Sequence, residues 1–168
     1  MKKFLKTLAV LAAVAALGFG FGFASCSDSD DDDDGGSGSA LVAYSSTDSN
    51  DETYTISFYS DNTYTMHMYS KSTVLGIAVT MDLDVEKGTY TGDPTKDGTV
   101  VGTSVSQPDK DKMEKLMMQA MVSGSKSLTI TNSNCPLVAL DSSDVETRKC
   151  TISGTTLTDD EGNKFTRK

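Results

Sequence analysis

The sequence predicts an all-β domain, an antiparallel meander that forms a small closed or nearly closed β-barrel of about eight strands with one inserted amphipathic helix. Three observations predict this fold. Apolar and polar residues alternate with a period of two through most of residues 41–168, which is typical of strands with one buried face. Clusters of Asp, Asn, Ser and Gly separate these segments. One stretch, residues 107–123, has helical spacing instead. Because a barrel removes exposed sheet edges, it suits many short antiparallel strands.

The first strands are expected at residues 53–60 and 63–70, as a hairpin around the turn-forming Ser60-Asp61-Asn62. Their alternating apolar residues are Tyr54, Ile56, Phe58, Tyr64, Met66 and Met68. A long strand is expected next, over residues 75–85, where every second residue is apolar. Its opposite face ends in Asp82 and Asp84, and Gly76 is expected to mark a bend.

Strand patterns continue to the end of the chain. They are expected around Tyr90, over residues 99–105, and at Leu128 and Ile130, Leu137–Leu140, Cys150 and Ile152, Leu157, and Phe165. Turns are expected at residues 93–98, at Gly154 and at residues 159–163.

The helix is expected over residues 107–123. Its apolar stripe, with spacing i, i+3, i+4, i+7, i+8, consists of Met113, Leu116, Met117, Ala120 and Met121. Ser106 and Asp109 resemble a capping box, and Gly124 is a natural stop. Because the stripe needs an apolar partner, we expect the helix to close one mouth of the barrel.

Methionines form the most suggestive group of side chains. Those that the predicted helix and strands bring to apolar faces include Met66, Met68, Met113, Met117 and Met121. Methionine fills irregular gaps in cores and also recurs on adaptable binding surfaces. Two interpretations therefore stay open: a helix that plugs the barrel, or a pocket for a small apolar ligand beneath a movable helical lid.

The segment Phe58-Tyr59-Ser60-Asp61-Asn62-Thr63-Tyr64-Thr65 resembles the F-x-x-D-G-T-Y hairpin of small lipocalin-like and META-like domains in bacterial lipoproteins. Residues 88–90 and 152–158 look like later strands of the same meanders. The resemblance implies a lipocalin-like barrel over residues 41–168. The Gly-x-Trp start of true lipocalins is missing, because the chain contains no tryptophan.

The N-terminal residues predict export. Three lysines within the first six residues precede an apolar run over residues 8–23, which has the size of a signal-peptide core. Phe23-Ala24-Ser25-Cys26 resembles the lipobox of bacterial lipoproteins. That resemblance implies that residues 1–25 are removed and that Cys26 carries a lipid anchor. Ordinary cleavage with Cys26 as a thiol, or an uncleaved membrane anchor, are the alternatives.

Residues 26–40 form the predicted tether. They contain six aspartates between Asp28 and Asp34, followed by Gly and Ser, and have nothing to bury. Acidic residues directly after a lipidated cysteine resemble the surface-export signals of some diderm bacteria. We therefore expect a lipid-anchored lipoprotein of the cell envelope and outer membrane. The acidic run is either a signal for export to the cell surface or only a solvated spacer.

Charge and motifs exclude several functions. The net charge is −9; without the three lysines of residues 1–25 it is −12, and without the six acidic residues of the tether the domain has −6. Such a domain repels phosphate backbones, so no nucleic-acid partner is expected.

His67 points away from Met66 and Met68 on a strand, which argues against a shared metal site. No nucleophile–base motif is present, so we expect neither an enzyme nor a cofactor.

Cys135 and Cys150 are expected to form a disulfide. If residues 137–140 and 145–149 pair as a hairpin around a four-residue turn, Cys135 lies opposite Cys150, within bridging distance. Two separate thiols are the alternative, with Cys150 a small buried hydrophobe.

Two functions are consistent with the sequence. The first is a membrane-anchored lipoprotein whose barrel binds a small apolar ligand. The second is a structural or interaction lipoprotein with a filled core, whose outer face meets another envelope protein or a host protein.

Overall fold

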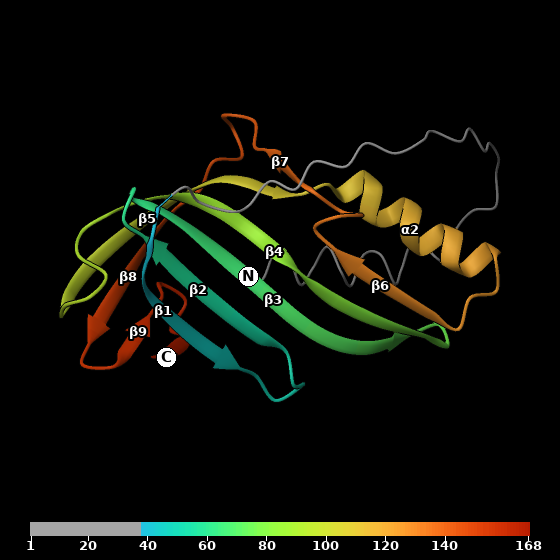
Figure 1. Ribbon diagram of the computed structural model, residues 1–168, viewed down its shortest axis with the longest axis horizontal. Coiled ribbons are helices and arrows are strands. Elements are labelled where there is room, and N and C mark those ends of the chain that lie inside the picture. Colours follow the sequence, from blue (N-terminus) through green and yellow to red (C-terminus); the bar gives the residue numbers. More distant parts are fainter. Residues whose placement is uncertain (1–37) are drawn as a thin grey trace.

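The computed structural model describes residues 38–168, so the predicted signal peptide, Cys26 and most of the tether lie outside the described residues. Its elements, coloured along the chain in Figure 1, are β1 (Ala40–Thr47), β2 (Thr53–Tyr59), β3 (Thr63–Val74), β4 (Ile77–Thr91), β5 (Gly98–Pro108), α2 (Lys110–Val122), β6 (Ser127–Thr131), β7 (Leu137–Ala139), β8 (Thr147–Ser153), β9 (Thr156–Thr158) and β10 (Lys164–Arg167).

Eight of the strands form a closed antiparallel barrel. The ring runs β1, β2, β3, β4, β5, β8, β9, β10 and returns to β1, where Tyr44 pairs with Arg167. The predicted fold class is therefore confirmed. Strands β6 and β7 lie outside this ring, on β4 and β5 respectively.

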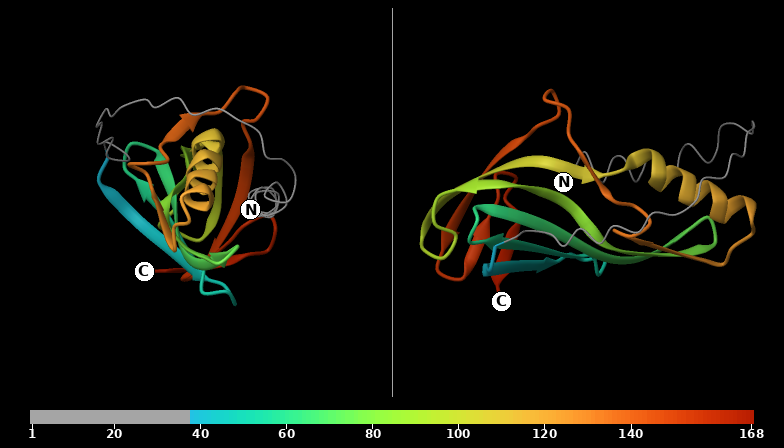
Figure 2. Two further views of the ribbon diagram at one scale, coloured as in Figure 1. Left: turned by 90° about the vertical axis from the view of Figure 1, so that its right-hand side faces the viewer. Right: turned by 45° about the horizontal axis from the view of Figure 1, so that its top comes forward.

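Strands β3 and β4 extend beyond the barrel on one side (Figure 1). Residues 87–91 of β4 pair with β5, whereas residues 78–82 pair in parallel with β6. We call the outer halves of β3 and β4, together with β6, the extension. Helix α2 lies along it, and in the end view it stands in front of the barrel (Figure 2).

The tip of the extension is a two-residue hairpin at Leu75 and Gly76, with φ of 52° and 80°. Positive φ at both central residues is the geometry that lets a two-residue loop follow the twist of its strands. The predicted strand over residues 75–85 therefore starts at Ile77, and Leu75 lies exposed in the turn rather than on the buried face. The bend expected at Gly76 is a full reversal of the chain.

A β-bulge interrupts the long β3–β4 ladder. Met66 pairs with Glu86 and His67 pairs with Asp84, so Val85 is the extra residue. Val85 and Glu86 are consecutive buried residues, because a bulge shifts which residues of the strand face inward. Beyond the bulge, even-numbered residues of β4 face the barrel interior.

Aromatic side chains fill the barrel. The Phe58 ring lies 6.2 Å from Tyr44, 6.1 Å from Tyr64 and 5.0 Å from Tyr90, measured between ring centroids. All four are buried. Tyr64 packs directly over Gly88, where an added Cβ would lie 2.6 Å from its ring and 2.2 Å from the Thr103 carbonyl oxygen.

We predict that Gly88→Ala destabilises the domain by about 1–3 kcal/mol or more, because the new methyl group collides with the backbone of β5 as well as with Tyr64. Gly102→Ala is the matched variant, since its Cβ would approach only the Tyr64 ring, at 3.3 Å. Urea denaturation measures both. Equal losses at the two positions would show that β4 and β5 lie further apart than described.

Candidate functional site

The predicted helix forms with a different start. Asp109 is the N-cap residue, and its carboxylate accepts a hydrogen bond from the Lys112 amide at 3.0 Å. Ser106 lies within β5, so the expected capping box with Ser106 is wrong. Gly124 has φ of 66°, and the Ser125 amide donates to the Ala120 carbonyl at 2.9 Å, which ends the helix as expected.

The structure brings the five singled-out methionines into one apolar core. Met66 and Met68 come from β3, Met113 and Met117 come from α2, and all four are buried. Met121 is partly buried and packs against the same core. The exposed fractions of Met66, Met68, Met113 and Met117 are 6%, 2%, 5% and 9%. All four belong to one cluster of buried core residues.

A charged cluster lies inside the barrel, and sequence reasoning missed it. Glu86 accepts a hydrogen bond from the Tyr64 hydroxyl, and its other oxygen lies 3.2 Å from Arg148 Nη1. Arg148 Nη2 lies 3.5 Å from Glu146 Oε2. Burial, followed by the Glu86 charge and its hydrogen bond, raises the pKa of Tyr64 well above its usual range, so the phenol stays protonated and keeps donating.

The cluster escaped prediction for two local reasons. Period-two alternation continued from Ile77 places residue 86 outside, and only the bulge at Val85 turns Glu86 inward. Arg148 lies in a segment that was expected to pair with residues 137–140. Its actual partner is β5, which directs Arg148, Cys150 and Ile152 to the less exposed side of β8.

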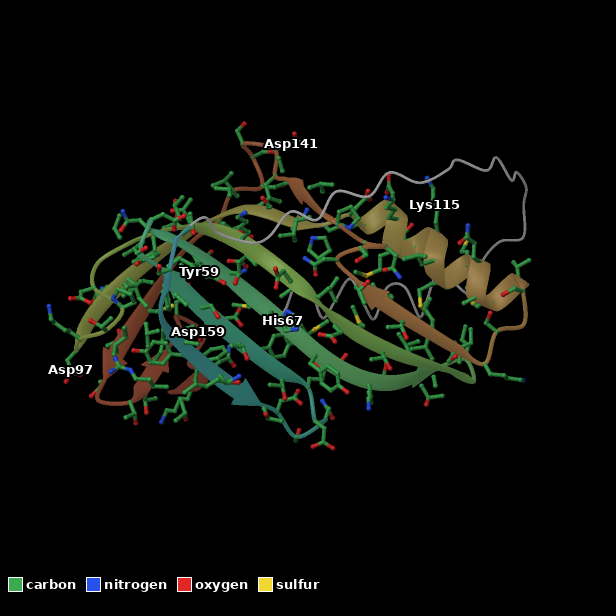
Figure 3. All side chains as sticks on the ribbon, in the orientation of Figure 1. Tyr59, His67, Asp97, Lys115, Asp141 and Asp159 are labelled. Atoms are coloured by element: carbon green, nitrogen blue, oxygen red, sulfur yellow. The ribbon has the colours of Figure 1, made fainter. Side chains whose placement is uncertain are left out.

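A second polar group is formed by His67 of β3, which is labelled in Figure 3, and by two aspartates of β4. Its Nε2 is 2.9 Å from Asp82 Oδ1, and its Nδ1 is 3.0 Å from Asp84 Oδ1. The two carboxylates occupy opposite ring nitrogens, so they do not converge on a common point. Among residues 38–168, no group of three His, Cys, Asp or Glu side chains could hold a metal ion.

The expected disulfide is wrong. Both thiols are free: Cys135 donates to the Asp109 carbonyl at 3.5 Å, whereas Cys150 pairs with Val100. Both segments pair with β5 rather than with each other. From position 100 to position 109 is nine residues along β5, or about 30 Å at ~3.3 Å per residue, far outside bridging distance. Burial raises the pKa of Cys150 to about 11.

Charge is distributed unevenly over the domain. No acidic residue occurs between Asp61 and Asp82, or between Glu114 and Asp141. These two stretches form most of the extension, the second half of α2 and β7. The large apolar side chains exposed near the tip are Leu75, Met118 and Val122. Lys71, Lys115 and Lys126 are exposed in the same stretches, and Figure 3 shows Lys115 on α2.

No family model, no curated protein and no solved structure matches this chain. The lipocalin-like and META-like resemblance therefore stays a prediction, apart from the barrel itself. Within residues 38–168, no helix has the length and apolar character needed to span a membrane.

We predict that Met117→Asp lowers the free energy of unfolding by about 3 kcal/mol or more, because it places a carboxylate in the core beneath α2. Met118→Asp, one position along the same helix, should change it by no more than about 0.5 kcal/mol, since Met118 is 56% exposed. Thermal or urea unfolding monitors both. Similar effects at the two positions would mean that α2 is not seated as described.

We predict that Glu86→Gln costs about 1–3 kcal/mol, because Arg148 loses a charged partner in the barrel interior. Glu146→Gln removes the more exposed partner of the same arginine and should cost clearly less. A double-mutant cycle with Arg148→Met measures each coupling by urea denaturation. Coupling of Arg148 to Glu146 that equals its coupling to Glu86 would contradict this arrangement.

Proposed function

We propose that this protein is a cell-envelope lipoprotein, anchored through Cys26, whose barrel is a solid scaffold for contact with another envelope protein or a host protein. One observation carries the proposal: side chains fill both the barrel and the space beneath α2. The aromatic cluster around Phe58 occupies the first, and the buried Met113, Met117 and Ala120 of α2 occupy the second. A scaffold needs this rigidity, whereas a carrier of small molecules needs room.

The position of the tether supports outward presentation of the extension. The chain enters β1 beside the β2–β3 turn, where the Ser60 amide donates to the Ser39 carbonyl at 2.9 Å. Strand β3 leads from that turn to the tip through 12 residues, which span about 40 Å at ~3.3 Å per residue. The tip therefore lies far from the point where the tether joins.

The surface of the tip also supports a contact function. Leu75 and Val122 are 64% and 73% exposed. Exposed apolar side chains in a region without acidic residues lower the desolvation and repulsion that oppose protein association.

Binding of a small apolar ligand is the alternative, and it requires α2 to move. Native mass spectrometry of the mature protein, extracted from membranes of the producing cells, distinguishes the two. If the protein is a scaffold, we expect the measured mass to equal that of the mature chain with its acyl groups. A further stoichiometric lipid that is lost on Met117→Asp, but kept on Met118→Asp, would establish the ligand site and overturn the scaffold.

We predict that Cys26→Ser moves the protein from the membrane fraction to the soluble fraction, or stalls its processing, because the acyl anchor can no longer form. Incorporation of labelled fatty acid measures the anchor directly. Ser37→Ala, which lies in the tether and leaves both the cysteine and the lipobox in place, is a comparison variant that should still incorporate the label. Label that persists in Cys26→Ser would contradict lipidation at this residue.

A further inference from the structure

His67 is bound by carboxylates at both of its ring nitrogens. The contacts, to Asp82 at 2.9 Å and Asp84 at 3.0 Å, join β3 to two positions of β4. A neutral imidazole has one N–H and one lone pair, whereas an imidazolium donates from both nitrogens. A carboxylate oxygen cannot donate to the lone pair, so this geometry is satisfied when the ring is protonated.

The place of this contact in the sheet gives it a structural consequence. Asp82 is the last residue of β4 that pairs with β6, and Asp84 lies in the short segment between it and residues 87–91, which pair with β5. His67 also borders the bulge at Val85. The Asp84 amide donates to Asn132 Oδ1 at 2.7 Å, which connects the same point to the segment after β6.

The carboxylates that contact His67 come from one strand. Strand β4 presents Asp82 and Asp84, while β2 presents the neutral Thr55, which lies opposite His67 in the ladder. The hydroxyl of Thr55 binds Lys168 Nζ at 3.1 Å. The segment after β6 contributes the neutral amide of Asn132. Asp82 and Asp84 thus share the imidazolium of His67 as a common cation. When the imidazole is neutral, the two negative charges repel each other and no cation lies between them.

We propose that His67 is a proton-dependent lock at the junction between the barrel and the extension. Protonated, it holds β3 to β4 where the sheet leaves the barrel. Deprotonated, it loses one of its two hydrogen bonds and leaves Asp82 and Asp84 uncompensated, so the extension with α2 opens more often relative to the barrel. This lock acts on the domain whether or not Cys26 is acylated.

The direction of the pH effect follows from the contacts. The hydrogen bond to Asp84 raises the pKa of His67; partial burial opposes it, and the hydrogen bond to Asp82 and both charges add to the rise. A histidine whose pKa is higher in the folded chain stabilises the fold fully below its unfolded pKa of about 6.5. That contribution is lost as pH rises through the folded pKa. The lock is therefore closed below the unfolded pKa and released when the pH rises above the folded pKa of His67.

The first test is an NMR titration of the ring protons in the mature chain with Cys26→Ser. His67 is the single histidine of the sequence, so its signals need no assignment. We expect a pKa above 6.5 that falls in Asp84→Asn and in Asp82→Asn. A wild-type pKa at or below 6.5 would overturn the lock, and this result requires no variant to fold.

The second test is hydrogen exchange of backbone amides on either side of the folded His67 pKa, corrected for intrinsic exchange rates. Protection of β6 and of residues 77–82 should fall several-fold relative to β8 and β9 when the pH rises. The His67→Gln variant should lose this pH dependence, while Lys71→Gln, on the same strand without a carboxylate partner, should keep it. Parallel changes in barrel and extension, or pH dependence that survives in His67→Gln, would overturn the proposal.

Discussion

Strand β4 pairs with β3 over residues 77–89, but it divides its other edge between two partners. Its second half pairs with β5 and closes the barrel, and its first half pairs in parallel with β6. Backbone amides and carbonyls inside a sheet must find partners, so β6 is required once β4 has separated from β5. The helix follows from the same constraint, because the inner side of the extension, with the buried Ile77, Val79 and Met81, would be exposed to water without an apolar cover.

The bulge at Val85 determines which face of β4 each carboxylate lies on. On one side of it, Asp82 and Asp84 point outward and bind His67; on the other, Glu86 points inward and binds Tyr64 and Arg148. Three acidic residues at alternating positions would otherwise share one face. One extra residue therefore gives both an interior ion pair and an exterior histidine site, and it explains why both occur where the sheet changes partners.

The periodicity of apolar residues predicted the features that depend on residues close together in the sequence. The buried residues of β2 and β3, the helix with its buried Met113, Met117 and Ala120, and the antiparallel barrel all follow from periodicity. Pairing between distant segments does not. Cys135 and Cys150 were placed together on the assumption that neighbouring strands form a hairpin, but β5 is long enough to pair with β7 at one end and β8 at the other. The bulge, and therefore the inward orientation of Glu86, depends on how β3 and β4 fit around the barrel. The alternation of apolar and polar residues in the sequence does not reveal it.

The side chains beneath α2 suit a junction that moves slightly. The helix is joined to the barrel through Pro108 and Asp109 and to the extension through β6, so the opening proposed at His67 would alter the distance between its two attachments. A core of rigid, branched side chains would resist such a shift through lost contacts. Methionine has three rotatable bonds and a polarisable sulfur, and it refills an irregular gap at little cost. Met113 and Met117 therefore allow α2 to stay packed while the extension adjusts, so that opening at the junction exposes less core than the same motion would with leucine or isoleucine.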